Sequence, residues 1–116
     1  MTKRILLVDD DAHLLETAHD ILEAAGYDVR SAESGSAALQ KLKAAPVHLM
    51  IVDYNLDDTT GVELALKARA LFPDIVIFLM TGEINIDLAA AKSAIQAVLT
   101  KPVNPAELIS MIKRMT

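Results

Sequence analysis

The sequence lacks several residue types that define common classes of site. Its 116 residues include no cysteine, which excludes a disulfide scaffold, a zinc–thiolate site and a thiol nucleophile, and fits a reducing compartment. Tryptophan is absent, and two tyrosines and two phenylalanines are too few to form a stacking platform for nucleic acid or a flavin. With 11 Lys and Arg against 16 Asp and Glu, the net charge of −5 argues against direct nucleic-acid contact.

Long apolar runs are also missing. The longest, Ile75–Met80, is far shorter than the roughly 18 residues that a membrane span needs. The aspartates of Asp9–Asp11 interrupt the first apolar stretch, so the N-terminus does not read as a signal peptide. A length of 116 residues predicts a single domain over 1–116, large enough to bury a core without metal or disulfide staples.

Short apolar runs alternate with longer segments of helical periodicity. Five strands are expected, at Arg4–Val8, Tyr27–Ala32, Val47–Val52, Ile75–Met80 and Ala97–Thr100. Five helices are expected between and after them, starting after Asp11, at Ser34, at Gly61, over Ile86–Ala94 and at Pro105. This alternation predicts an α/β fold with a doubly wound parallel sheet. The continuous apolar runs Ile5–Val8, Leu49–Val52 and Ile75–Met80 suit strands covered on both faces, and the two more polar strands should lie nearer the edges.

Polar residues stand at the C-terminal ends of four of the predicted strands. Asp9 and Asp10 follow the first strand and Asp53 ends the third. Thr81 ends the fourth strand and Lys101 the fifth. The carboxyl ends of parallel strands share one edge of the sheet, where ligands bind in such folds. If the first and third strands are neighbours, the three aspartates share one pocket, and the long stem of Lys101 can reach it.

Three neighbouring carboxylates need a counter-charge. Two carboxylates about 4 Å apart repel by about 4 kcal/mol at an effective dielectric of 20, and three by about 10 kcal/mol, more than one lysine can offset. Either a proton is retained or a divalent cation binds, and an all-oxygen ligand set suits Mg²⁺ or Mn²⁺. The hydroxyl of Thr81 and the ammonium of Lys101 beside such a cation are the expected partners of a phosphoryl group.

Four segments of the sequence, each at the end of a predicted strand, resemble the receiver domain of bacterial two-component response regulators. They are Ile5–Asp11, Met50–Leu56 with Gly61 after it, Met80–Glu83 and Leu99–Pro102. The resemblance covers essentially the whole chain. It implies a flavodoxin-like, doubly wound, five-stranded parallel sheet in the order 2-1-3-4-5, with five helices.

The resemblance also implies a role for each residue at this edge. Asp53 would accept a phosphoryl group from a phosphohistidine on a sensor histidine kinase or a histidine phosphotransfer protein. Asp9, Asp10, Asp53 and the backbone carbonyl of Asn55 would hold Mg²⁺. The protein would catalyse only its own phosphorylation and dephosphorylation, so we do not expect an enzyme in the usual sense. We expect it in the cytoplasm.

On the same resemblance, Lys101 pairs with Asp53 and later with a phosphoryl oxygen, the Lys101–Pro102 peptide bond is cis, and the hydroxyl of Thr81 moves to the phosphoryl group. We expect the output, including any homodimer, to use the face formed by the helix over 86–94, the last strand and the last helix. Val98 occupies a position in that strand where the family usually has an aromatic residue, so the familiar inward rotation of that ring cannot occur.

The family pattern is broken at three further places. Asp57 and Thr60 replace a frequent proline and a frequent aspartate in the loop after Asp53, and Ala94 with Ile95 replaces the usual Gly-Ala before the last strand. The pocket is intact and the output face is altered.

Simpler interpretations stay open at this stage. Asp9–Asp11 could be no more than the acidic start of a helix, with Asp11 as its cap. Asp57 and Asp58 are interpreted as solvated loop acids. The alternative function is a non-phosphorylated receiver-like interaction module. A phosphatase or a flavin protein of the same shape is disfavoured because the sequence has no phosphate loop and few aromatics.

Overall fold

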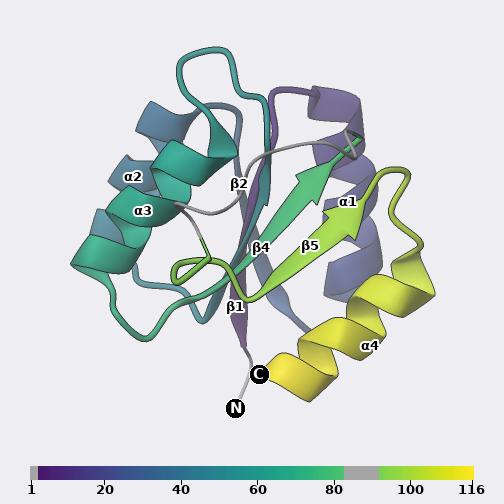
Figure 1. Cartoon of the computed structure of the whole chain (residues 1–116). Coiled ribbons are helices and arrows are strands. Elements are labelled where there is room, and N and C mark those ends of the chain that lie inside the picture. The colour runs from purple at the N-terminus through teal and green to yellow at the C-terminus, as the bar shows by residue number, and fades with distance from the viewer. Residues whose placement is uncertain (1–2, 83–91) are drawn as a thin grey trace.

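The computed structural model describes residues 3–82 and 92–116 (Figure 1). Its strands are β1 (Arg4–Val8), β2 (Asp28–Ala32), β3 (Leu49–Asp53), β4 (Val76–Thr81) and β5 (Ala97–Thr100). Its helices are α1 (Ala12–Ala24), α2 (Gly35–Ala44), α3 (Gly61–Leu71) and α4 (Pro105–Met115). Within the described residues, no helix combines the length and the apolar character that crossing a bilayer requires.

All five strands are parallel and lie in the order β2-β1-β3-β4-β5. Helices α2 and α3 cover one face of the sheet, and α1 and α4 cover the other (Figure 1). The predicted fold class and strand order are confirmed, and the two more polar strands, β2 and β5, are the edges. The order makes β1 and β3 neighbours, as the shared pocket requires.

Each face of the sheet carries its own apolar core. On the α2–α3 face, Ala38 and Leu42 of α2 and Leu64 of α3 are buried against the sheet. On the other face, Leu22 of α1 and Ile112 of α4 are buried in the same way. Because both faces are covered, the central strands are apolar from Ile5 in β1, from Leu49 in β3 and from Val76 in β4 until each strand ends.

Side-chain caps fix where the helices begin. At the start of α1, the carboxylate of Asp11 accepts hydrogen bonds from the backbone N–H groups two and three residues later. At the start of α4, the side-chain oxygen of Asn104 accepts the equivalent two bonds, and Pro105 is the first helical residue. The hydroxyls of Ser34 and Thr60 each accept one such bond, at the start of α2 and α3. Such caps satisfy amides that the helix cannot pair internally.

Three expected strand starts were wrong by one or two residues. Tyr27 is tied by its N–H to the carbonyl of Leu22, so it closes the end of α1 before β2 begins. The N–H of Ile75 likewise bonds to Phe72 in a turn, and β4 begins at Val76. Pairing of β3 with β1 begins at Leu49 instead of residue 47.

One expected helix cannot be compared in full. Most of the stretch 86–94 lies outside the described residues, and its last three residues, 92–94, form a turn. The structure therefore describes four of the five expected helices.

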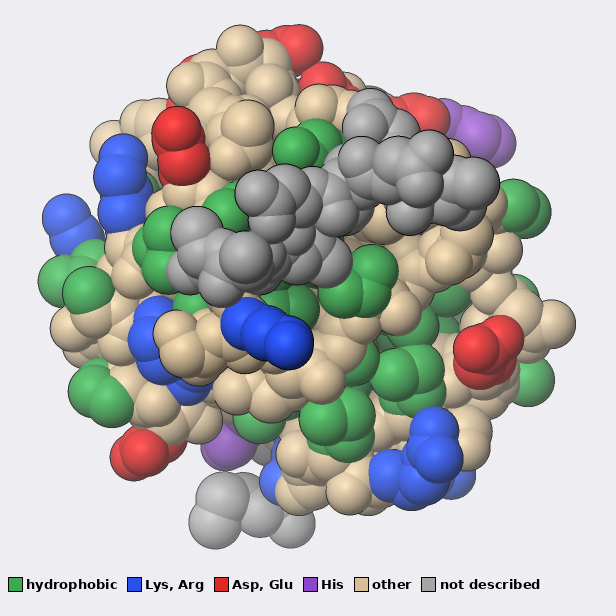
Figure 2. All heavy atoms as spheres, in the orientation of Figure 1, with side chains coloured by type: hydrophobic (Ala, Val, Ile, Leu, Met, Phe, Trp, Pro, Cys, Tyr) green, Lys and Arg blue, Asp and Glu red, His purple; other side chains and the backbone are tan. Residues whose placement is uncertain are grey.

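Some apolar side chains stay at the surface. Val98 on the edge strand β5 is 43% exposed, and Met115 at the end of α4 is 38% exposed. Figure 2 shows hydrophobic side chains gathered on the face over β5 and α4. This face includes part of the predicted output surface.

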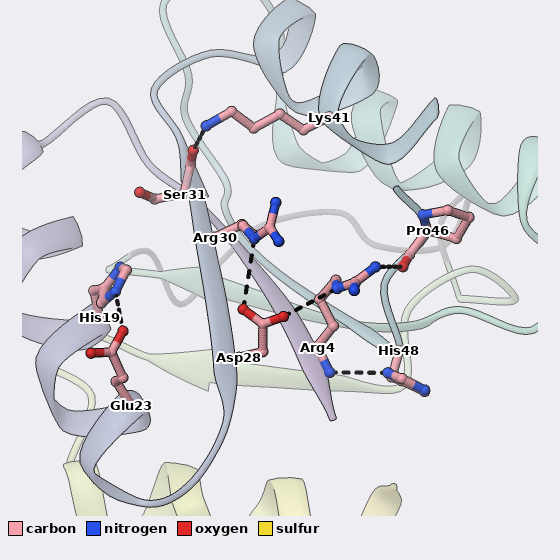
Figure 3. Close-up of polar contacts among 9 residues, drawn as sticks. All are labelled: Arg4, His19, Glu23, Asp28, Arg30, Ser31, Lys41, Pro46 and His48. Carbon is pink, nitrogen blue, oxygen red and sulfur yellow. Dashed lines mark hydrogen bonds and ion pairs between the residues drawn. The ribbon is translucent and has the colours of Figure 1, made fainter. Parts of the chain in front are cut away.

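At the amino edge of the sheet, side chains complete the backbone pairing. The N–H of Arg4 donates to Nδ1 of His48 over 3.0 Å, while the N–H of His48 donates to the carbonyl of Arg4 (Figure 3). The guanidinium of Arg4 also contacts Asp28 and the carbonyl of Pro46. Nδ1 of His48 takes the place of a backbone carbonyl as the acceptor for the N–H of Arg4, so the β1–β3 ladder can end here without leaving that N–H unpaired.

Gln96 does the same at the start of β5. Its N–H donates to the carbonyl of Ile77 over 2.9 Å, and its side-chain oxygen accepts from the N–H of Ile77 over 2.7 Å. Arg69 of α3 donates to the same Gln96 oxygen over 3.0 Å and to the carbonyl of Ala94 over 2.9 Å. The side chain of Gln96 thus replaces a backbone acceptor and ties β4 to α3.

Candidate functional site

The structure brings the three predicted aspartates together at the carboxyl edge of the sheet. Asp9 and Asp10 directly follow β1, and Asp53 is the last residue of the neighbouring β3. Each offers one carboxylate oxygen, and these oxygens all lie within 4.8 Å of one another. Asp9 is 1% exposed and Asp53 8%, while Asp10 is exposed to solvent.

Lys101 reaches this cluster from the end of β5. Its Nζ lies 2.6 Å from Oδ1 of Asp53 and 3.2 Å from Oδ2 of Asp9. The lysine therefore bridges two buried carboxylates that come from two different strands. Its own N–H bonds to the carbonyl of Thr81 over 2.8 Å, which keeps the two residues adjacent.

Burial dominates the electrostatics of Asp9. It raises the pKa of the Asp9 carboxyl, and the charge of Asp53 raises it further, while the N–H of Asp11 and the ammonium of Lys101 oppose the rise without cancelling it. Burial acts on Lys101 in the opposite sense, but its hydrogen bond to Asp53 and the charges of both aspartates prevail and raise its pKa. The lysine is thus held charged beside carboxylates that it only partly neutralises.

The donor set fits a hard divalent cation. Three carboxylates converge, one of them open to solvent, and only one cation is paired with them among the described residues. Mg²⁺ prefers oxygen ligands, is commonly held by a few carboxylates and keeps several waters. The exposed side of the cluster at Asp10 leaves room for those waters.

The loop after Asp53 folds back on itself. The N–H of Gly61 donates to the carbonyl of Tyr54 over 2.7 Å, and Asn55 pairs with Thr60 in an isolated antiparallel bridge. A Cβ at Gly61 would lie 2.3 Å from the carbonyl oxygen of Asp53, so this position requires glycine. The closed loop keeps Asn55, two residues after Asp53, at the same edge of the sheet.

Thr81 is 3% exposed and ends β4, next to β3. The Lys101–Pro102 peptide bond is cis, as the resemblance implied. The structure therefore gathers Asp9, Asp10, Asp53, Thr81 and Lys101 at one edge, as the positional argument predicted. The roles of these residues, and the use of the Asn55 carbonyl as a ligand, remain predictions.

Asp57 and Asp58 are exposed, as expected of solvated loop acids, but both also make contacts that the sequence did not predict. Asp58 is exposed, yet its carboxylate accepts hydrogen bonds from the N–H groups of Gly35 and Ser36, which lower its pKa. The charge of Asp10 and a hydrogen bond with it raise the pKa of Asp57. No local sequence signal connects residues this far apart, since only the fold brings the loop to α2 and to the end of β1.

Comparison with known proteins assigns the chain to a protein family. The family model of the response regulator receiver domain matches residues 5–113, and the chain belongs to this family. A receiver domain is the phosphoacceptor module of a two-component signalling system, and this is the function that the family membership gives the chain. Nothing in the comparisons supports the alternative of a non-phosphorylated interaction module.

Similar proteins agree with this assignment. The chain is 34% identical to the response regulator receiver protein CpdR of Brucella abortus, over 97% of this chain and 96% of that protein. It spans only 25% to 52% of several other relatives, which are named as transcriptional regulatory proteins.

Solved structures match closely as well. A receiver domain from Methanospirillum hungatei has a TM-score of 0.93 at 34% identity, covering 98% of this chain and 93% of that one. The response regulator TrrA of Thermotoga maritima, solved in complex with Mg²⁺-BeF, has a TM-score of 0.88 at 30% identity, covering 99% of this chain and 100% of that one.

Proposed function

We propose that Asp53 is the residue that accepts the phosphoryl group, and that Asp9, Asp10, Asp53 and the carbonyl of Asn55 hold Mg²⁺. The observation that carries this proposal is the convergence of three carboxylates on neighbouring strand ends with Lys101 as a shared partner. The TrrA structure, which contains Mg²⁺-BeF, supports the choice of cation.

The reaction follows from the groups present. An oxygen of Asp53 attacks the phosphorus of a phosphohistidine, the P–N bond breaks, and the imidazole nitrogen leaves with the electron pair. Bound Mg²⁺ supplies charge neutralisation for the phosphoryl oxygens. Lys101, 2.6 Å from Asp53, holds that carboxylate in place and then pairs with a phosphoryl oxygen.

The product of the reaction is the phosphorylated domain itself, and no small molecule derived from a separate substrate is released. The hydroxyl of Thr81 lies on the neighbouring strand end and binds the phosphoryl group once it is attached. This changes charge and contacts at one edge of the sheet, the kind of local event that biases a two-state element. Water then hydrolyses the aspartyl phosphate, so the domain acts only on itself and is not an enzyme with a separate substrate.

The partner that donates the phosphoryl group is a sensor histidine kinase or a histidine phosphotransfer protein, as family membership supports, and we place the exchange in the cytoplasm. We further propose that the face over β5 and α4, where hydrophobic side chains gather (Figure 2), mediates output by forming a homodimer. Val98 of β5 is exposed and belongs to the predicted output face. Sedimentation with beryllofluoride and Mg²⁺ should show a dimer, and a concentration-independent monomer would refute it.

Phosphorylation by a small phosphodonor tests the site directly. Wild-type protein incubated with acetyl phosphate and Mg²⁺ should gain the mass of one phosphoryl group, because Asp53 needs only an activated phosphorus and the cation. The gain should disappear with EDTA and in Asp53→Asn, which keeps the shape of the side chain but removes the nucleophile. No gain in the wild type, or full gain in Asp53→Asn, would overturn the proposal.

A further inference from the structure

The loop that follows the predicted phosphoacceptor is anchored on helix α2 by Asp58. One carboxylate oxygen of Asp58 accepts from the N–H of Gly35 over 2.9 Å, and the other accepts from the N–H of Ser36 over 3.0 Å. The side-chain hydroxyl of Ser34, the cap residue of α2, accepts from the N–H of Ala37 and reaches neither Gly35 nor Ser36. Asp58 therefore satisfies two amides that the cap leaves over, although it lies 23 residues away from Gly35 in the sequence.

A second contact presses the loop against the same helix. A Cβ at Gly35 would lie 2.4 Å from Cγ2 of Thr59, so there is no space between helix and loop at this point. The Thr59 side chain is fixed in turn, because its hydroxyl donates to Glu63 of α3 over 2.8 Å. The tip of the loop is thus wedged between α2 and α3.

Inside the loop, hydrogen bonds connect this anchored tip to the metal-binding end. The N–H of Leu56 donates to the carbonyl of Thr59 over 3.1 Å, and Asn55 bridges to Thr60. A displacement at Asp58 is therefore passed to Asn55 through a short, closed segment. Asn55 is the residue whose backbone carbonyl we propose as a Mg²⁺ ligand.

We propose that Asp58 is a positioning residue for the metal site, which uses the N-terminus of α2 as a fixed support for the loop that carries Asn55. The proposal rests on the proposed function, since it concerns the same cation. It differs from a simple capping role for α2, which would affect the stability of the fold and leave the affinity of the folded protein for Mg²⁺ unchanged.

Matched substitutions separate position from charge. Asp58→Asn and Asp58→Ala remove the same charge, but only asparagine retains a side-chain oxygen that can accept from Gly35. Asp74→Asn, in the turn before β4 at the opposite edge of the sheet, controls for the loss of one negative charge. The measurement is the Kd for Mg²⁺ by calorimetric titration of the folded protein, with unfolding in urea measured separately.

Removal of the outer partner of a metal ligand typically weakens metal binding by about 10- to 100-fold, and we expect the lower end of that range for Asp58→Ala because Asp58 acts through the loop. Asp58→Asn should lose roughly threefold, since one of two hydrogen bonds remains. Asp74→Asn should bind Mg²⁺ as the wild type does.

A perturbation from the helix side gives an independent check. Gly35→Ala leaves every loop residue and every charge in place, but its Cβ must displace Thr59. We expect a loss of Mg²⁺ affinity, and an NMR shift of the Asn55 amide in the metal-free protein. If Asp58→Ala does not fold, this variant and Asp58→Asn carry the test.

Equal Kd values for Asp58→Asn and Asp58→Ala, or an unchanged Kd in Gly35→Ala, would overturn the role of Asp58 while the wild type still binds Mg²⁺ and accepts a phosphoryl group. Failure of the wild type to bind Mg²⁺ at all would instead overturn the proposed function. The two failures are therefore distinguishable in the same set of titrations.

Discussion

The two edges of the sheet differ in how their polar groups are balanced. At the carboxyl edge, Asp9 and Asp53 are buried side by side and share a single lysine, Lys101. At the amino edge, the side chains of His48 and Gln96 accept hydrogen bonds from backbone N–H groups at the ends of the strand pairs (Figure 3 shows His48). The carboxyl edge thus keeps more negative charge than its lysine neutralises, whereas at the amino edge side chains supply acceptors for backbone N–H groups that would otherwise be unpaired.

This difference indicates where the protein gives up stability for function. Buried groups are ordinarily paired, and departures from that rule gather at functional sites. Neutralising a carboxylate at the carboxyl edge should therefore weaken ion binding strongly and leave the fold as stable as before or more stable. Removing a side-chain acceptor at the amino edge should weaken the fold and leave ion binding unchanged.

The largest expected effect follows from Asp9→Asn. Mg²⁺ binding should weaken by roughly 100-fold or more, since a direct ligand is lost rather than an outer partner. In metal-free buffer at neutral pH, the free energy of unfolding should rise by about 1 kcal/mol, as is common when a strained functional site is relieved. Lys101 keeps its partner Asp53, so no buried charge is left alone. Calorimetric titration and urea unfolding in EDTA measure the two effects.

Measuring the unfolding free energy of Asp9→Asn and the wild type over a range of pH tests whether the gain in stability comes from removing the buried charge of Asp9. Because burial raises the pKa of Asp9 in the folded protein, the folded state holds a proton more tightly than the unfolded chain does. Below the ordinary carboxyl pKa of about 3.9, Asp9 is protonated in both states and its burial costs no charge desolvation. As the pH rises from there through the raised pKa of Asp9 in the folded protein, the free energy of unfolding falls. The stability gap between Asp9→Asn and the wild type should open over that interval. A gap that is constant with pH, or a less stable variant at neutral pH, would contradict the charge argument.

Most of the fold was predictable because it depends on local patterns. The apolar runs identified β1 and β5 with their observed bounds, and Ser34 and Pro105 identified the starts of α2 and α4. The missed strand starts lie where a side chain or a turn takes over backbone pairing. His48 uses Nδ1 to bond Arg4, and such a substitution cannot be recognised in a sequence without knowing which strands are neighbours.

The candidate site divides in the same way. Asp53 and Lys101 were predictable because Asp53 ends one strand and Lys101 directly follows another, and parallel strands bring their ends to one edge. Asp58 was not, because its partners Gly35 and Ser36 belong to another helix, and an acidic residue in a polar loop gives no sign of a distant contact. Local chemistry thus identifies what the site contains, whereas its support depends on contacts that only the folded chain creates.

The smaller effect is expected at the amino edge. In Gln96→Ala the N–H of Ile77, a fully buried residue, loses its acceptor. An unsatisfied buried N–H costs about 1–3 kcal/mol, and we expect the lower half of that range because Gln96 itself is exposed and water can reach part of the gap. Urea unfolding measures this loss. The Kd for Mg²⁺ should stay within twofold of the wild type, because β4 presents the opposite end to the metal site.

Gln96→Glu is the matched control for this prediction. Its carboxylate keeps an acceptor for the N–H of Ile77 and gains charge beside Arg69, which donates to the same oxygen in the wild type. It should therefore retain wild-type stability, or exceed it, because hydrogen bonds between charged partners are stronger than neutral ones. If Gln96→Glu is as unstable as Gln96→Ala, the amide nitrogen rather than the oxygen is what matters at this position. If Gln96→Ala weakens Mg²⁺ binding as strongly as it weakens the fold, the two edges are coupled and the separation argued for them fails.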